Sequence, residues 1–168
     1  MKNIILIGMP GSGKSTVGAI LSKRLQLSFV DTDAMVVKAA GRAIADIFAQ
    51  DGEEAFRDLE SEAARQAGAM EGAVIATGGG IIKRPENMRA LSQNGIVFFL
   101  DRPPEEIAGD DHSARPLIGE DREKVFRLYR ERIRLYRKYG QHRVTNVANA
   151  SAAASVILRI YKRKEGLT

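Results

Sequence analysis

Eight residues near the N-terminus have the types and the spacing of a phosphate-binding loop. The segment from Gly8 to Ser15 reads Gly-Met-Pro-Gly-Ser-Gly-Lys-Ser and fits the pattern G-x-x-x-x-G-K-[S/T]. Glycines let backbone N–H groups turn towards phosphate oxygens, and the N-terminus of the following helix adds partial positive charge. In such a loop the lysine, Lys14, reaches the β- and γ-phosphates, and the Ser15 hydroxyl binds Mg²⁺. The loop therefore predicts a site for a nucleoside triphosphate and Mg²⁺.

Two aspartates follow a short apolar run that ends at Val30. Asp31 and Asp33 would stand at the carboxyl end of a strand, where carboxylates can hold Mg²⁺ and a hydroxyl that accepts phosphate. Asp33 also fits the N-cap of a helix that begins at Ala34, and the two roles are compatible. Asp101 follows another apolar run in the same way. Because Arg102-Pro103-Pro104 comes next, we favour a turn or a helix cap for Asp101 over a metal ligand.

Three consecutive glycines follow a third apolar run, Ala73–Ala76. The segment Thr77-Gly78-Gly79-Gly80 predicts that another group approaches the backbone closely, although a flexible turn would have the same composition.

Three arginines are candidates for binding an anion. Arg57 lies on the flank of an amphipathic segment with Glu60 three residues later, so a carboxylate can prepare it to bind a second carboxylate, although a plain surface ion pair would have the same spacing. Arg132 falls inside the apolar arc of the helical pattern 122–139 and requires an anionic partner, either an internal carboxylate or a bound anion. Arg115 lies in the small, polar stretch 108–117, which has the composition of a lid or of a plain surface loop.

The elements that would position these residues alternate between strands and helices. Short, almost continuous apolar runs are typical of strands that are buried on both faces of a parallel sheet. We expect strands over 4–7, 27–30, 73–76, 96–100 and, more weakly, 144–147. Helical patterns separate these runs at 14–25, 34–40, 53–68, 86–93, 122–139 and 151–162. The order predicts an α/β fold with helices on both faces and a ligand site beyond the carboxyl ends of the strands.

The composition excludes several classes of protein. The chain has 168 residues, which predicts one domain, and it has 0 Cys and 2 His, which argues against disulfides and against a thiolate or histidine metal site. No apolar run is long enough for a membrane span, and no signal peptide is evident, so we expect a cytoplasmic protein. The net charge of +5 suits anionic partners, whereas the 6% of aromatic residues is low for a nucleic-acid stacking surface.

Taken together, the motifs resemble the shikimate kinase family over nearly the whole chain. The phosphate loop alone marks only a superfamily, but the aspartate pair, the segment Gly52-Glu53-Glu54-Ala55-Phe56-Arg57 and the triple glycine are specific in combination. Arg115-Pro116-Leu117 and the pairing of Arg132 with Leu135-Tyr136 extend the resemblance.

The resemblance implies transfer of the γ-phosphoryl group of ATP to the 3-hydroxyl of shikimate, a step of aromatic amino acid biosynthesis. It implies a three-layer α/β/α kinase fold with a five-stranded parallel sheet and a mobile lid. Residues 1–168 would form one domain, with the lid at about 108–120 and an acceptor-binding helical segment at about 33–62.

The resemblance also implies a role for each site residue. Lys14, Asp33 and Arg115 would be catalytic. Mg²⁺ would be bound by Ser15 and, through water, by Asp31. ATP would be held by Gly11, Ser12, Gly13, Lys14, Ser15, Thr16 and Arg115. Shikimate would be held by Asp33, Arg57, Gly78, Gly79, Gly80 and Arg132, with Glu60 bracing Arg57.

The resemblance is to proteins that act mostly as cytoplasmic monomers without nucleic-acid or membrane partners. Members of the family often carry another basic residue before the Arg-Pro-Leu of the lid, whereas the stretch 107–111 is acidic in this chain. Two other functions stay open at this point. One is a different small P-loop kinase that acts on gluconate or a nucleoside monophosphate. The other is a nucleotide switch or nucleic-acid-binding module that uses the exposed arginines of 122–139.

Overall fold

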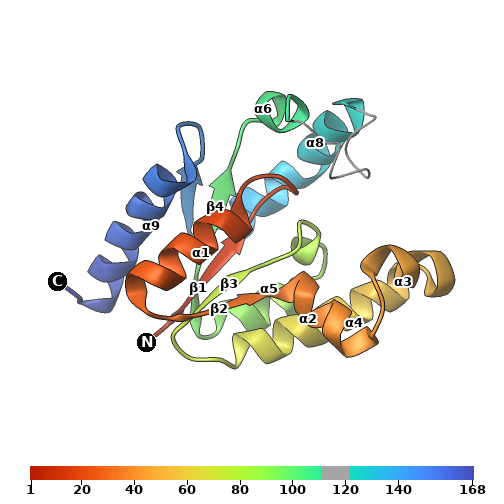
Figure 1. The fold of residues 1–168 in the computed structure, drawn as a ribbon, viewed down its shortest axis with the longest axis horizontal. Helices are drawn as coiled ribbons and strands as arrows, with labels where there is room; N and C mark the ends of the chain where they lie inside the picture. The colour runs from red at the N-terminus through yellow and green to blue at the C-terminus, as the bar shows by residue number, and fades with distance from the viewer. Residues whose placement is uncertain (111–121) are drawn as a thin grey trace.

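One parallel sheet organises the chain, and its strand order is β2-β3-β1-β4-β5 (Figure 1). The computed structural model describes residues 1–110 and 122–168. Every pairing in the sheet is parallel, which confirms the predicted fold class. The strands are β1 (Asn3–Ile7), β2 (Ser28–Asp31), β3 (Ala73–Ala76), β4 (Gly95–Asp101) and β5 (His142–Thr145).

Helices cover both faces of the sheet because successive side chains of its central strands point in opposite directions. In β1, Ile5 and Ile7 join an apolar cluster with residues of α4 (Glu53–Gly68), α5 (Pro85–Ser92) and α8 (Arg122–Tyr139). Ile4 and Leu6 join a second cluster on the other face, with residues of α1 (Lys14–Leu25) and α9 (Ala150–Glu165). The result is the expected three-layer arrangement, in which α1 and α9 lie side by side (Figure 1).

Three predicted helices begin and end as expected, namely α1, α4 and α8. Two short helices were not predicted, α3 (Ile44–Asp51) and α6 (Pro104–Ala108), and a single 3₁₀ turn, η1 (Ile81–Lys83), follows the triple glycine. Each is too short for its apolar periodicity to stand out in a sequence window. Among the helices that the structure describes, none is both long enough and apolar enough to cross a membrane.

A separate helical unit projects from the β2 edge of the sheet. It consists of α2 (Thr32–Ala40), α3 and α4, shown in orange and yellow in Figure 1. A third apolar cluster holds these helices together, formed by Val36 of α2, Ile47 of α3, and Phe56 and Ala63 of α4. This unit contains the segment 33–62 for which acceptor binding was predicted.

The last strand lies two residues earlier than predicted. The sequence favoured 144–147 because of its two valines, but β5 ends at Thr145, and Val147 is 57% exposed in the following loop. The Asn146 N–H donates to the Asp101 carbonyl at 2.9 Å, which marks the point where the two strands separate. Asn146 therefore belongs to the carboxyl edge of the sheet, where ligands are expected.

A buried asparagine ties the start of β1 to its neighbours, and its loss should destabilise the fold. Asn3 is fully buried; its Oδ1 accepts from the Ala73 N–H at 2.9 Å and its Nδ2 donates to the Met70 carbonyl at 2.7 Å. Asn3→Ala leaves the buried Ala73 N–H unpaired, so we expect urea unfolding to show a loss of about 1–3 kcal/mol. Asn94→Ala is the control, because Asn94 also donates to Met70 but Asn3 still satisfies that carbonyl. Equal losses in the two variants would contradict this account.

Candidate active site

The phosphate loop joins β1 to α1 and is shaped by its glycines. Gly11 and Gly13 have φ angles of 84° and 98°, in a region that side-chain-bearing residues rarely adopt. Gly13 is the residue from which α1 starts, so the loop leads directly into a helix N-terminus. The Lys14 ammonium lies over the loop and donates to the carbonyls of Gly8 and Met9 at 2.7 and 2.8 Å. This geometry is that of a phosphate cradle with a lysine beside it.

Ser15 and Asp31 lie together at the mouth of this loop. The Ser15 hydroxyl donates to Asp31 Oδ2 at 3.3 Å. The other carboxylate oxygen, Oδ1, accepts from the N–H groups of Asp33 and Ala34 at 2.8 and 3.2 Å. Asp31 is therefore the N-cap of α2, and the prediction that Asp33 caps a helix from Ala34 was wrong, because the helix begins earlier, at Thr32.

The oxygen donors in this region fit Mg²⁺. One hydroxyl and one carboxylate are hard ligands, and Mg²⁺ commonly takes only one or two protein oxygens and completes its shell with phosphate and water. Over residues 1–110 and 122–168 there is no cluster of three or more His, Cys, Asp or Glu side chains that would form an all-protein metal cage.

Asp33 lies against the first glycine of the triple-glycine segment. A Cβ atom on Gly78 would stand 2.5 Å from Asp33 Oδ1, so any side chain at this position would displace the carboxylate. The Gly78 N–H donates to the buried Thr32 hydroxyl at 3.1 Å, which fixes this approach. Burial, together with the charges of Asp31 and Glu60, raises the pKa of Asp33 to about 6. A carboxyl group with this pKa can exchange a proton near neutral pH.

Arg57 lies against the third glycine. A Cβ atom on Gly80 would stand 2.4 Å from Arg57 Nη1. The guanidinium is held from behind, because Nη1 donates to Oε1 of the buried Glu60 at 2.9 Å and Nε donates to Glu53 Oε1 at 3.3 Å. The predicted bracing of Arg57 by Glu60 is therefore present, and Glu53 adds a contact that the sequence did not reveal.

Arg132 lies against the middle glycine. A Cβ atom on Gly79 would stand 2.6 Å from Pro10 Cδ and 3.1 Å from Arg132 Nη1. Among the described residues, the buried Nε atom of Arg132 has no hydrogen-bond partner. No carboxylate within the described part of the chain forms an ion pair with Arg132. Of the two partners that the sequence left open, an internal carboxylate is not found among the residues that the structure describes. The Tyr136 hydroxyl donates to the Gly79 carbonyl at 2.7 Å and holds the segment against α8.

Two cavities meet at the phosphate loop. The first, which we call the nucleotide cavity, has a volume of about 300 Å³ and extends from Thr16 to the loop after β5 and to the residues that follow β4. The second, which we call the acceptor cavity, has about 220 Å³, and its lining includes Lys14, Ser15, Asp31, Asp33, Gly78 and Gly79. Both cavities share Gly11, Gly13 and Thr16. A molecule with a phosphate chain can therefore lie in one cavity and present its terminal phosphate to the other.

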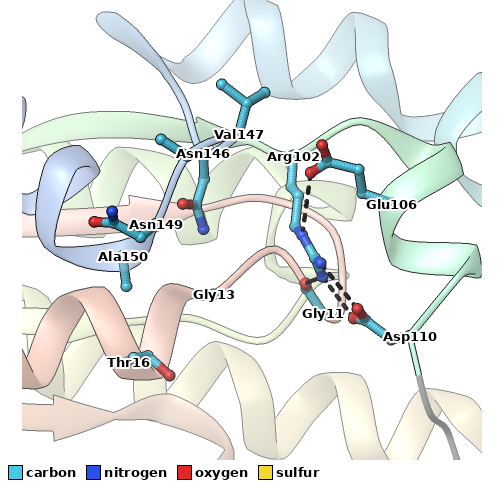
Figure 2. A pocket seen from close by; sticks show the side chains of 11 residues that line it. Gly11, Gly13, Thr16, Arg102, Glu106, Asp110, Asn146, Val147, Asn149 and Ala150 are labelled. Atoms are coloured by element: carbon cyan, nitrogen blue, oxygen red, sulfur yellow. Dashed lines mark hydrogen bonds and ion pairs between the residues drawn. The ribbon is translucent and has the colours of Figure 1, made fainter.

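The sequence missed two residues of the nucleotide cavity, Arg102 and Asn146, both of which follow strands directly (Figure 2). The Asn146 side chain donates to the Ser12 carbonyl at 2.9 Å and supports the phosphate loop. Asp101 lines neither cavity, since its carboxylate accepts from Arg143 Nε at 2.7 Å and from the Tyr129 hydroxyl at 3.2 Å. The sequence favoured a turn or a helix cap for Asp101, but Asp101 is the last residue of β4, and Pro103 is the N-cap of α6. Arg115 and most of the predicted lid lie outside the described residues.

Comparison with known proteins points to one family. The family model for shikimate kinase matches residues 10–162. A shikimate kinase from Clostridium botulinum is 44% identical over 164 residues, which are 96% of this chain and 97% of the relative. The solved structure of a shikimate kinase from Acinetobacter baumannii in complex with shikimate has a TM-score of 0.90 at 34% identity and covers 98% of this chain and 94% of that one. A shikimate kinase from Aquifex aeolicus has a TM-score of 0.82 at 33% identity, with 96% of this chain and 98% of that chain covered.

The raised pKa of Asp33 predicts how stability depends on pH. Between about pH 4 and pH 6 the folded protein holds a proton on Asp33 that the unfolded chain releases, so stability falls as the pH rises through this window. Asp33→Asn should remove this effect and make the protein more stable by on the order of 1–2 kcal/mol at pH 7.5, with no gain below pH 4. Urea unfolding at both pH values measures the difference. A gain of the same size at both values would show that Asp33 does not titrate in this range.

Proposed function

Because this chain belongs to the shikimate kinase family, we propose that it phosphorylates the 3-hydroxyl of shikimate with ATP, and that Asp33 directs this hydroxyl. Membership of the family decides against the other acceptors that the sequence left open, gluconate and nucleoside monophosphates. The observation that supports the residue roles is the glycine segment, whose three members face Asp33, Arg132 and Arg57 in turn. A carboxylate and two cations at fixed positions fit a ligand that carries hydroxyl groups and one carboxylate.

Asp33 serves as the proton acceptor in the proposed reaction. The 3-hydroxyl oxygen attacks the γ-phosphorus, the bond from this phosphorus to the β,γ-bridging oxygen breaks, and the hydroxyl proton passes to the Asp33 carboxylate. With a pKa of about 6, Asp33 is mostly ionised at neutral pH and can take this proton. The remaining contribution of the protein is to position the reactants and to neutralise charge.

Arg57 and Arg132 hold the shikimate carboxylate. They come from different helices, α4 and α8, and reach the same glycine segment. Guanidinium groups form paired hydrogen bonds to a carboxylate, so two of them fix both the position and the orientation of the ring. The guanidinium of Arg132, whose buried Nε has no hydrogen-bond partner among the described residues, then gains an anionic partner.

The phosphate loop holds the nucleotide through the N–H groups of Gly11, Ser12 and Gly13 and through Lys14, Ser15 and Thr16. Ser15 and, through water, Asp31 would hold Mg²⁺, which would supply positive charge for the phosphates of ATP. The proposed catalytic role of Arg115 concerns a residue outside the described part of the chain.

The remaining expectations form part of the same proposal. Residues 1–168 act as one kinase domain, with a lid at about 108–120 and the acceptor segment at about 33–62 on the helical unit α2–α4. Its ligands are ATP and shikimate, and it needs neither nucleic acid nor a membrane. We place it in the cytoplasm as a monomer, which size-exclusion chromatography with light scattering can test.

ADP release from Mg-ATP tests the acceptor directly. We expect strong stimulation by shikimate and none by gluconate or AMP over the rate without acceptor. Stimulation by gluconate or AMP that equals the rate with shikimate would contradict the proposed function.

Replacing Asp33 tests its role as proton acceptor. Asp33→Asn keeps the shape of the side chain but cannot take a proton, so we expect kcat to fall by roughly 10²–10⁴-fold. The affinity for ATP, measured by calorimetry, should stay within about twofold because Asp33 does not line the nucleotide cavity. Asp46→Asn, on the exposed first turn of α3, is the matched control. Retention of full turnover in Asp33→Asn would refute the assignment.

Removal of the arginines should affect shikimate far more than ATP. For Arg57→Ala and Arg132→Ala we expect KM for shikimate to rise by about 10- to 100-fold, because each removes charged hydrogen bonds of roughly 1.5–3 kcal/mol. Gly80→Ala should raise the same KM, since its methyl group would displace Arg57. Gly109→Ala is its control, with no atom closer than 3.3 Å to the new Cβ. An unchanged KM for shikimate in both arginine variants would contradict the carboxylate clamp.

A further inference from the structure

Arg102 places a guanidinium in the wall of the nucleotide cavity (Figure 2). It follows the last residue of β4, and its side chain turns back towards the phosphate loop, with 23% of its surface exposed. Its Nη1 donates to the Gly11 carbonyl at 3.0 Å. Gly11 belongs to both cavities, so this guanidinium lies where the phosphate chain of a nucleotide passes from one cavity to the other.

Two carboxylates surround the same guanidinium. Asp110 accepts from both terminal nitrogens, from Nη1 at 2.5 Å and from Nη2 at 2.9 Å. Glu106 Oε2 lies 3.7 Å from Nε. Both acidic residues also line the nucleotide cavity. The local group of one arginine and two acids therefore carries a net negative charge in a cavity that must accept an anion.

We propose that Arg102 contacts the phosphate chain of the bound nucleotide, and that Asp110 competes with the nucleotide for this arginine and so lowers its affinity. The proposal rests on the assignment of this cavity to the nucleotide. The edge of a guanidinium formed by Nη1 and Nη2 can bind a phosphate through two hydrogen bonds, and Asp110 occupies this edge. The arginine must turn away from Asp110 before it can bind phosphate in the same way.

The charges around Arg102 indicate that Asp110 competes with the nucleotide for this arginine and does not merely orient it. Asp110 covers the Nη1–Nη2 edge of Arg102, and Glu106 lies beside Nε on the remaining edge, so carboxylates face both edges of this guanidinium. Asp110 thus neutralises the charge that the nucleotide would meet, and Glu106 adds a second negative charge beside it. Removal of the Asp110 charge therefore frees a cation for the phosphates and removes a repulsion at the same time.

The affinity for ADP, measured by calorimetry, tests the proposal without the acceptor reaction. We expect Asp110→Asn to lower Kd by about 3- to 10-fold and Arg102→Ala to raise it by about 10-fold. Arg102→Lys keeps the charge but loses the fork, so it should give an intermediate Kd. The matched control is Glu105→Gln. It removes one negative charge from an exposed position of α6 that does not line the nucleotide cavity.

Asp110→Asn should bind ADP more tightly than the unchanged protein. If this gain in affinity is smaller in a variant that also carries Arg102→Ala, Asp110 acts through the arginine, as proposed. A weaker or unchanged affinity in Asp110→Asn would overturn the proposal, as would a tightening of the same size in Glu105→Gln. Backbone amide shifts on addition of ADP separate this proposal from its premise. Shifts confined to regions outside residues 146–150 and the phosphate loop would overturn the nucleotide cavity itself. Shifts within these residues would support the assignment of this cavity to the nucleotide. The affinity of Asp110→Asn for ADP then decides whether the Asp110 carboxylate and the phosphates compete for Arg102.

Discussion

The active site depends on the close approach of one backbone segment to three charged side chains. Gly78, Gly79 and Gly80 leave β3 at its carboxyl end, and each lies within contact distance of a different group, Asp33, Arg132 or Arg57. These groups come from three helices: α2 and α4 of the helical unit at the β2 edge, and α8, which packs on the sheet. A side chain at any of the three glycines would push its neighbour away, so the segment sets the spacing of the whole acceptor site.

Charges of opposite sign are distributed along the carboxyl edge of the sheet to suit two anionic reactants. In the proposed reaction Lys14 would bind the phosphate chain, and the braced Arg57 and Arg132 would bind a carboxylate. Asp33 is the acidic group among them, and its burial near Asp31 and Glu60 raises its pKa to about 6. On this proposal the cations lie where the reactants carry charge, and a weak base lies where a proton leaves.

The sequence predicted the parallel sheet and the phosphate loop because both depend on local patterns. It predicted Asp33 as the N-cap of α2, whereas Asp31 caps this helix, because both lie close to the helix start and either side chain suits an N-cap. The prolines after Arg102 predicted a turn, but they gave no sign of its contact with Gly11. That contact depends on how the chain bends after β4, and hydrophobic periodicity carries no information about this bend. Val147 was assigned to a strand for its β-branched side chain, although the ladder ends at Thr145.

The central claim is that the acceptor site recognises a carboxylate with two arginines on one side of the ring and directs a hydroxyl with Asp33 on the other. The most direct test compares shikimate with its methyl ester, which keeps every ring hydroxyl but has no negative charge. We expect kcat/KM for the ester to be lower by about 100-fold, because the charged hydrogen bonds to both arginines are lost. Equal kcat/KM values for the acid and the ester would contradict the account.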